Sequence, residues 1–391
     1  MTANPKKLGL YRTTTFFRAF LMFAVDLFGY ALFLPWVIYR HLHGKTFDPE
    51  RVSKIAVFRL DGIGDLVLSA PAINALRKFF PKARITLFAN KWSNGLAEMI
   101  SGPDEVIYLD ATFFKAFKKK VTVHSLLKER RQLLRIGRNR RYDLALDLRG
   151  DFFSILDACW LKPRWLFSRS SRAGSFLLTN MLAQAQEGYV SEALLNIRFI
   201  GKVTKQRTPP SNPELKPPPE LDLNWIDQKL GDDYVCLAVA APYVTRCYPT
   251  ESWLEVIVKI RQKYKKPIAV LGSPDEYQYC QVITAQADED VHNMAGKLSL
   301  TESVALIRRC RLFIGNDGGL IHIASAFQRP LVQLFGPASA VCFGHTGKNE
   351  HVIQKDCPFN PCAEPNCRKP ENWCMERITP EEIYSMARRY L

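Results

Sequence analysis

The chain has 391 residues, of which 47% are hydrophobic and 24% charged, so it is neither disordered nor limited to one small domain. A net charge of +16 predicts attraction to an anionic membrane surface or a phosphorylated substrate. No nucleic-acid-binding motif is visible, so nucleic acid is not an expected partner. The ten cysteines suit a reducing cytoplasm better than a disulfide scaffold.

The first 50 residues are predicted to associate with a membrane. Residues 16–39 are apolar and flanked by basic side chains, and they are long enough for a span of roughly 20 residues. Asp26 and Pro35 disfavour a simple span, because a charge at the bilayer centre costs about 2.5–3.5 kcal/mol. We therefore favour an interfacial helix, with a spanning helix and a helix packed on the protein as alternatives.

Two α/β domains follow, separated by a proline-rich linker at residues 208–222. We expect an N-terminal Rossmann-like domain at 51–207 and a C-terminal one at 223–391. Alternating strands and helices predict a parallel sheet in each domain, covered on both faces. In the first domain, strands are expected at 54–60, 84–89, 105–109 and 142–148, and a helix at 66–80. In the second, strands are expected at 234–240, 267–271, 312–315 and 331–335, and helices at 251–264, 276–287, 299–310, 320–327 and 380–390.

A strand-to-helix turn at residues 59–65 (RLDGIGD) places a carboxylate at a helix start. Gly62 and Gly64 allow the backbone to bend closely, but the full dinucleotide fingerprint is absent. Asp65 either caps the helix or acts as a base.

A second turn at residues 312–322 (LFIGNDGGLIH) joins an apolar strand to a helix. Free amides and the helix dipole meet there, which suits a phosphate. Asp317 adds a carboxylate for sugar hydroxyls. The alternative is a glycine-rich turn in which Asp317 is only an N-cap.

These segments together resemble one enzyme family. Residues 58–72 (FRLDGIGDLVLSAPA), 142–148 (YDLALDL), 313–322 and 334–337 (LFGP) resemble the motifs of the family 9 glycosyltransferases, the bacterial heptosyltransferases of lipopolysaccharide core synthesis. The resemblance covers roughly residues 54–385. The first 50 residues and a basic insertion at 111–141 lie outside it.

The resemblance implies a GT-B fold, in which two Rossmann-like domains face each other across a cleft. It also implies an inverting transfer from an ADP-activated heptose, without a metal, onto a lipopolysaccharide core or other anionic lipid acceptor. The proposed base falls on Asp65, and Asp61 is the less favoured candidate.

The resemblance places donor contacts at Asp317 and His322, and the amides of Gly318 and Gly319 at the helix start can stabilise the leaving ADP. His322 could instead be a buried helix residue. Arg246 stands where the family often has lysine, and its alternative is an exposed surface residue. Gly62 and Gly64 complete the predicted donor-binding set.

The segment 115–141 is strongly basic with interleaved apolar residues. We interpret it as a patch for a phosphorylated lipid, the alternative being a solvated helix face. The enzyme is then expected at the cytoplasmic face of the inner membrane, as a peripheral protein or with one N-terminal anchor. The patch residues are Lys118, Lys119, Lys120, Arg130 and Arg131.

Four cysteines cluster near the C-terminus, and no cofactor is expected for catalysis. Their spacing is looser than that of zinc ribbons, so a structural zinc, two disulfides and free thiols are all alternatives. The four are Cys357, Cys362, Cys367 and Cys374.

Two other functions are compatible with the same fold. One is a GT-B sugar-nucleotide epimerase, which would not explain a lipid-directed basic patch. The other is a membrane-tethered interaction protein that has lost catalysis, against which the presence of Asp65 and Asp317 argues.

Overall fold

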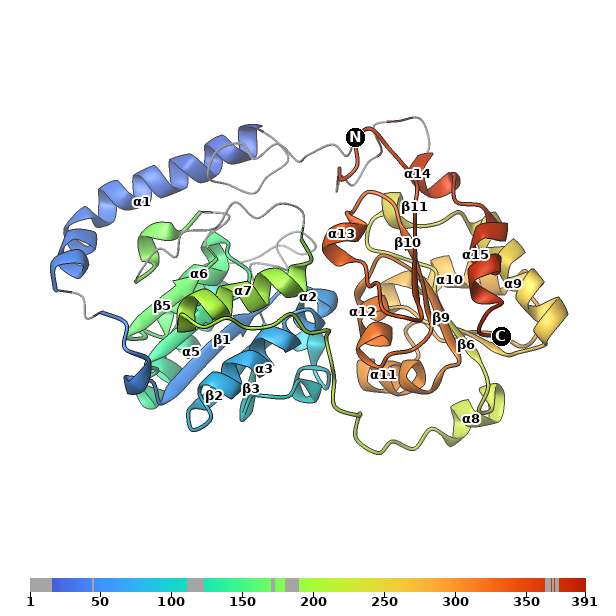
Figure 1. Ribbon diagram of the computed structural model, residues 1–391, viewed down its shortest axis with the longest axis horizontal. Helices are drawn as coiled ribbons and strands as arrows, with labels where there is room; N and C mark the ends of the chain where they lie inside the picture. The colour runs from blue at the N-terminus through green and yellow to red at the C-terminus, as the bar shows by residue number, and fades with distance from the viewer. Residues whose placement is uncertain are drawn as a thin grey trace. The chain divides into compact units, whose positions relative to one another are not determined.

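The fold is taken from a computed structural model. It describes residues 16–43, 46–110, 123–169, 173–179, 190–362, 367, 369 and 373–391. The chain divides into two compact units (Figure 1), one holding most described residues up to Ser211 and the other holding Asn212–Leu391. Residues 207–223 contain no helix or strand, as expected for a segment so rich in proline.

The N-terminal unit contains a five-stranded parallel sheet in the order β3-β2-β1-β4-β5. β1 is central, and all but its first residue are buried, because helices cover both faces of the sheet. Phe58 of β1 stacks on Phe88 of β2 with ring centroids 4.5 Å apart. The strands are β1 (Lys54–Arg59), β2 (Arg84–Asn90), β3 (Glu105–Leu109), β4 (Leu144–Asp147) and β5 (Trp165–Ser168).

The helices of this unit depart from the predicted ones in two respects, since α6 and α7 were not predicted and one expected helix is broken. The helix expected at 66–80 is two helices, α2 (Ile63–Val67) and α3 (Ala70–Phe79). The break is consistent with Pro71, which is tolerated only in a first helical turn. β5 was not predicted. The remaining helices are α1 (Phe16–His43), α5 (Val123–Arg140), α6 (Phe152–Trp160) and α7 (Glu192–Thr204).

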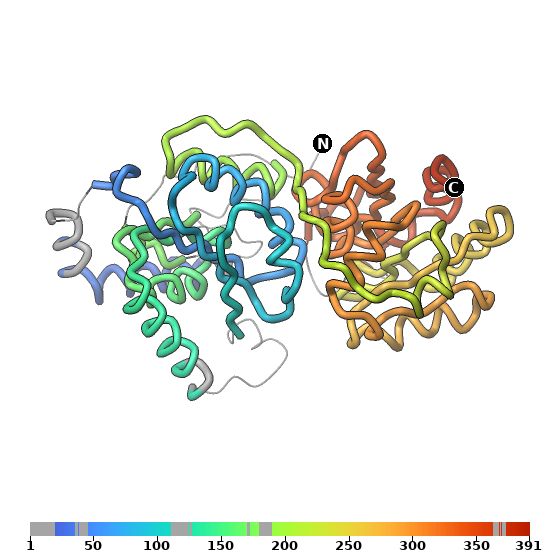
Figure 2. Tube along the Cα trace, turned by 90° about the horizontal axis from the view of Figure 1, so that it is seen from below, coloured from blue at the N-terminus to red at the C-terminus, as the bar shows by residue number. Residues whose placement is uncertain are grey.

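α5 extends from the body of its unit (Figure 2) and packs on α6. The close approach depends on Gly137, where a Cβ would lie 2.1 Å from the carbonyl oxygen of Leu161. Two buried carboxylates occupy these helices, Glu129 on α5 and Asp157 on α6. Burial, reinforced by the charge of Glu129, raises the pKa of Asp157 to about 8.

Asp157 therefore makes stability depend on pH. Above about pH 4 the unfolded chain has released this proton while the native state keeps it, so native stability falls as pH rises towards 8, by up to about 1.4 kcal/mol per pH unit. Asp157→Asn cannot titrate. We therefore expect its melting temperature, relative to that of the wild type, to rise between pH 5.5 and pH 7.5. Equal pH dependence in both proteins would contradict this assignment.

The C-terminal unit contains a six-stranded parallel sheet in the order β11-β10-β9-β6-β7-β8. β6 and β9 lie side by side at the centre, where a Cβ on Gly315 would lie 2.9 Å from that of Ala238. The strands are β6 (Val235–Ala238), β7 (Ile268–Val270), β8 (Val291–Asn293), β9 (Leu312–Asn316), β10 (Leu331–Phe335) and β11 (Glu350–Gln354).

Helices flank both faces of this sheet (Figure 1), with α11 and α12 on one side and α9, α10 and α15 on the other. Capping boxes at Ser299 and Thr379 begin α11 and α15. β8 and β11 were not predicted, being edge strands with weak patterns. The helices are α8 (Asn224–Leu230), α9 (Thr250–Tyr264), α10 (Tyr277–Thr284), α11 (Leu300–Arg309), α12 (Gly319–Ala326), α13 (Ala340–Phe343), α14 (Trp373–Glu376) and α15 (Pro380–Ala387).

Candidate functional site

In the N-terminal unit, a buried arginine organises the carboxyl end of the central strand. Arg59, the last residue of β1, donates through Nη1 to the carbonyl oxygen of Leu148 at 2.6 Å. Its Nη2 lies 3.1 Å from Oδ1 of Asp65, and its Nε lies 2.9 Å from Oδ1 of Asp61. Sequence reasoning assigned Arg59 no role, although its place just before the glycine turn was a usable signal.

The two carboxylates on this arginine differ in access. The Asp61 side chain is 11% exposed and the Asp65 side chain 36% exposed. Burial raises the pKa of Asp61 to about 6 against the opposing charge of Arg59. α2 begins at Gly62 without a side-chain cap, and the described contact of the Asp65 carboxylate is with Arg59. A Cβ on Gly62 would lie 3.0 Å from Oδ2 of Asp65, so the glycine leaves that oxygen room.

A further buried carboxylate lies at the end of the neighbouring strand. Asp147 ends β4, accepts hydrogen bonds from the Ser168 hydroxyl and the Gly150 amide, and has its pKa raised to about 6 by burial. Arg149 follows it, pairing with Asp151 and lying 3.6 Å from Asp61. Asp147 was predicted only as part of a strand. The contact of Arg149 with Asp61 links the loop after β4 to the loop after β1.

In the C-terminal unit, the carboxyl end of β9 carries the predicted donor residues. Asp317 is 5% exposed, and its Oδ2 lies 3.1 Å from Nη1 of Arg246, without the alignment of a hydrogen bond. Burial raises the pKa of Asp317 and the charge of Arg246 opposes that shift. The neighbouring Asn316 donates to the carbonyl oxygen of Val239 at 2.6 Å, while its own Oδ1 is buried without a partner. Two buried oxygens therefore lack hydrogen-bond donors here, which suits a ligand rich in hydroxyls.

Arg246 was predicted either as a donor ligand or as an exposed surface residue. Its side chain is 26% exposed and is held between the carboxylate of Asp317 and the ring of Tyr243, whose centroid lies 5.7 Å from the guanidinium carbon. The loop after β6 thus brings a cation to the end of β9, because the two strands are neighbours in the sheet.

His322 on α12 forms a buried pair that the sequence did not reveal. Its Nδ1 lies 2.7 Å from Nε2 of His345, which follows α13. Burial lowers the pKa of both rings to about 3, so at neutral pH one neutral ring donates to the other. Gln333 on β10 holds the backbone of His345 through both its amide nitrogen and its carbonyl oxygen. No sequence motif links His345 to His322, since the pair forms only through the fold.

The glycines of the predicted phosphate cradle lie where α12 begins. Gly318 is the N-cap residue in extended backbone, and Gly319 is the first helical residue. Amides in the first turn of a helix have no partner within the helix, so these two face outwards from its positive end. Their role in binding phosphate, like that of Gly62 and Gly64, stays a prediction.

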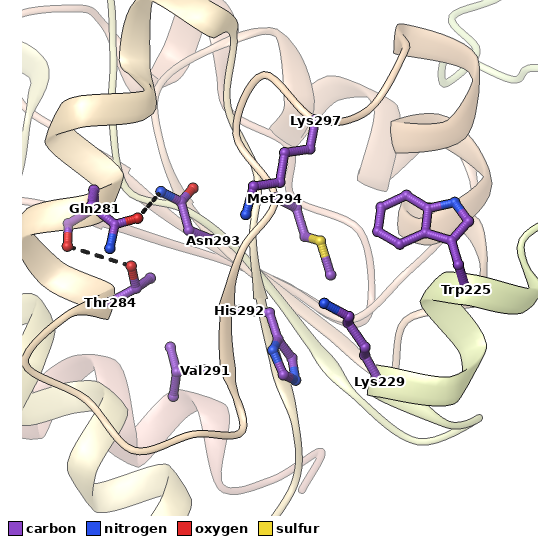
Figure 3. Close-up of a pocket in the computed structure, with 9 residues that line it drawn as sticks. All are labelled: Trp225, Lys229, Gln281, Thr284, Val291, His292, Asn293, Met294 and Lys297. Atoms are coloured by element: carbon purple, nitrogen blue, oxygen red, sulfur yellow. Dashed lines mark hydrogen bonds between the residues drawn. The ribbon is translucent and has the colours of Figure 1, made fainter.

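A separate pocket of about 240 Å³ opens in the C-terminal unit between α8, α10 and β8 (Figure 3). Two lysines and an indole face it, and Gln281 accepts from Asn293 at 3.0 Å on its wall. None of the predicted donor residues lines this pocket. Its lining residues are Trp225, Lys229, Gln281, Thr284, Val291, His292, Asn293, Met294 and Lys297.

Two other predictions fall partly beyond the described structure. Of the basic patch, Lys118, Lys119 and Lys120 lie outside the described residues, whereas Arg131 is exposed on α5 and Arg130 is partly buried there. The four C-terminal cysteines are free thiols, and burial raises the pKa of Cys374 to about 11. Within the described ranges, no three His, Cys, Asp or Glu side chains are grouped to hold a metal ion. A structural zinc stays a prediction.

Comparison with known proteins identifies the family to which these two units belong. The family model for glycosyltransferase family 9 (heptosyltransferase) matches residues 130–372, more than half of the chain. The chain belongs to glycosyltransferase family 9. It is therefore a glycosyltransferase of the heptosyltransferase family, as the motifs predicted.

Individual relatives agree with this family assignment. The chain is similar to lipopolysaccharide heptosyltransferase 2 of Escherichia coli, with 25% identity over 84% of this chain and 96% of the relative. Its fold matches that of E. coli ADP-heptose lps heptosyltransferase II with a TM-score of 0.70 at 20% identity, over 86% of this chain and 98% of that one. E. coli heptosyltransferase WaaC with ADP-2-deoxy-2-fluoro heptose matches with a TM-score of 0.64 at 16% identity, over 86% and 100% of the two chains.

These similarities support the predicted α/β architecture with two parallel sheets. They also favour a transferase over the two alternatives raised from the sequence, the epimerase and the inactive interaction protein.

Proposed function

We propose that this glycosyltransferase transfers a heptose, or a related sugar, from an ADP-sugar to a hydroxyl of a lipopolysaccharide core or other lipid-linked acceptor, with inversion at the anomeric carbon. The observation that carries the proposal is the contact between the buried Asp317 and Arg246 at the end of β9, where Asp317 Oδ2 and Asn316 Oδ1 lack hydrogen-bond donors. A carboxylate for sugar hydroxyls and a guanidinium for phosphate are the groups that an activated sugar requires.

Asp65 is proposed as the general base. It removes the proton from the acceptor hydroxyl while that oxygen attacks the anomeric carbon, and the bond from that carbon to the ADP oxygen breaks with its electron pair leaving on ADP. Asp65 is more exposed than Asp61 and is held in place by Arg59 from the rigid end of β1. Asp61 is almost enclosed by two arginines, which suits a residue that positions Arg59.

The departing ADP gains negative charge, which the chain can stabilise with its own groups. Arg246 supplies a fixed cation, and the amides of Gly318 and Gly319 supply donors at the positive end of α12. His322 is kept neutral by burial and is oriented by His345. It can therefore form a hydrogen bond with the ADP-sugar as a neutral group. We accordingly propose transfer without a metal or other cofactor.

Two aspects of the setting belong to the same proposal. By family resemblance, the two units form the halves of a GT-B enzyme, with acceptor chemistry in the N-terminal one and donor chemistry in the C-terminal one. A lipid-linked acceptor places the reaction at the cytoplasmic face of the inner membrane. The solved heptosyltransferase structure supports the two-domain fold, and the membrane setting depends on the lipid-linked acceptor proposed here.

The donor assignment is testable by calorimetry with ADP-heptose, ADP, GDP and UDP. We expect the adenine nucleotides to bind and ADP-heptose to bind most tightly, because the sugar adds contacts to Asp317. Product formation with lipopolysaccharide core acceptor should then be followed by mass spectrometry. Tighter binding of UDP or GDP would overturn the donor assignment, and loss of ADP-heptose by epimerisation without acceptor would overturn the transfer.

A further inference from the structure

α1 presents an unusual surface to its surroundings. Its outward side chains are apolar from residue 20 to residue 38, a length of about 27 Å at 1.5 Å per residue. Between Arg18 and Arg40 the sequence contains a single charged residue, Asp26. The exposed large side chains on the outward side are Phe20, Leu21, Phe23, Leu27, Phe28, Leu32, Leu34 and Ile38, with exposed fractions of 48–70%.

That single charge is turned towards the protein. Asp26 is 7% exposed, and its Oδ1 accepts hydrogen bonds from the amides of Gly174 at 2.8 Å and Ser175 at 3.2 Å. Those amides belong to the short 3-10 turn η4 (Ser175–Leu177) of the same unit and to the residue before it. The carboxylate thus attaches the middle of α1 to the body of the unit, along whose outside the helix lies (Figure 1).

Apolar packing strengthens the attachment on the same side of the helix. A Cβ on Gly29 would lie 2.2 Å from the ring of Phe176, so the glycine allows direct contact between helix and turn. The ring of Phe176 also lies 6.0 Å from that of Tyr30 and 5.6 Å from that of Phe33. Residues 26, 29, 30 and 33 recur at helical spacing, so they define one inward face.

An ordinary interfacial helix has a polar face towards water and an apolar face towards lipid. In α1 the face that would otherwise contact water packs on the protein instead, because Asp26 is hydrogen-bonded to the backbone at η4. The described outward side chains between residues 20 and 38 are all apolar. Such a surface offers no hydrogen-bonding groups, so the surroundings that suit it best are the acyl chains of a lipid bilayer. Protein interfaces, in contrast, carry a polar rim and about one hydrogen bond per 100–200 Å².

We propose that α1 lies in the plane of an anionic bilayer surface, immersing its outward apolar face while Asp26 holds it to the enzyme. In this arrangement α1 binds the membrane while it remains packed on the enzyme, and it does not act as a separate flexible anchor. A transmembrane placement would strip Asp26 of both amide partners and bring its carboxylate into hydrocarbon.

Charge on the same unit favours an anionic surface. The net charge of the whole chain is +16, and α5, which belongs to the same unit as α1, exposes four basic side chains. α5 and α1 pack against one continuous apolar cluster that contains Leu133, Ile136 and Tyr30. The exposed basic residues of α5 are Lys128, Arg131, Arg135 and Arg138.

Vesicle flotation of the full chain tests this proposal. Phosphatidylcholine vesicles with and without phosphatidylglycerol serve as probes, and the wild type should bind the anionic ones more tightly. The double variant Leu27→Glu with Phe28→Glu should bind at least about tenfold more weakly, because two outward side chains become charged. The matched control Val258→Glu with Val282→Glu, two exposed apolar residues of the other unit, should bind as the wild type does.

Three outcomes would overturn the proposal. The first is equal binding of the double variant and its control. The second is retention of the protein in membranes after alkaline carbonate extraction, which would indicate a span. The third is a stable dimer by light scattering that the double variant abolishes without any vesicle binding, which would assign the face to a second copy. Asp65→Asn should float like the wild type, so the result is separable from that of the transfer reaction.

Discussion

Replacing Asp65 with asparagine is expected to lower kcat by about 10²–10⁴-fold, with the affinity for the donor unchanged. The expected loss is that of a positioned general base, whose removal leaves the acceptor hydroxyl to attack without proton transfer. Asparagine has nearly the same shape and can still accept from Arg59, so the turn at residues 61–65 should keep its conformation. The measurement is ADP release from ADP-heptose in the presence of acceptor, alongside calorimetry of ADP binding.

Asp61→Asn is the matched control, because both carboxylates contact the same arginine. We expect a smaller loss of activity from it, through a less firmly held Arg59, together with a change in melting temperature. A larger loss from Asp61→Asn than from Asp65→Asn would assign the base to Asp61. If Asp65→Asn retains more than about a tenth of the wild-type kcat, the residue is not the base.

The second large effect is expected at the buried pair in the C-terminal unit. Asp317→Asn and Arg246→Met should each weaken ADP-heptose binding by about 10–100-fold, since hydrogen bonds to charged groups contribute about 1.5–3 kcal/mol. The two residues are in contact, so the double variant should lose less binding free energy than the sum of the losses of the two single variants. Arg246→Met also leaves a buried carboxylate without its cation, so its pKa will rise further and the fold will lose stability.

Comparing two ligands separates the roles of the pair. If Asp317 binds sugar hydroxyls, Asp317→Asn will weaken ADP-heptose binding much more than ADP binding, whereas Arg246→Met will weaken both. Arg246→Lys should keep part of the affinity, because it preserves the charge but not the planar fork. Lys259→Met serves as the control, since its pair with Glu381 is exposed and distant from β9 in sequence. Wild-type affinities in Asp317→Asn would remove that residue from the donor site.

The prediction of the fold succeeded where the local signal was strong. Apolar runs gave β1, β3 and β10 within a residue, and the predicted starts of α11 and α15 were also correct within a residue. The elements that were missed include the helices α6 and α7 and three edge strands with weak local signals. β5, β8 and β11 have only three to five residues each, and their pairing with a neighbouring strand is what makes them strands.

The candidate site divides in the same way. Asp65, Asp317 and the glycines around them could be found in the sequence, because glycine turns between an apolar strand and a helix follow local rules. His345 as the partner of His322 could not be found, because that contact joins segments that only the fold brings together. Arg59 was overlooked, although the two carboxylates that it holds lie only two and six residues away in the sequence.

The sequence by itself determined the family, the two α/β halves, the proline linker and the positions of the two loops that carry chemistry. All of these depend on the order and spacing of residues along the chain. Only the tertiary structure decided which carboxylate is accessible, which cation pairs with Asp317 and which way Asp26 faces. Burial, pKa and ion pairing depend on the surroundings of a side chain in space, and residues far apart in the sequence supply those surroundings.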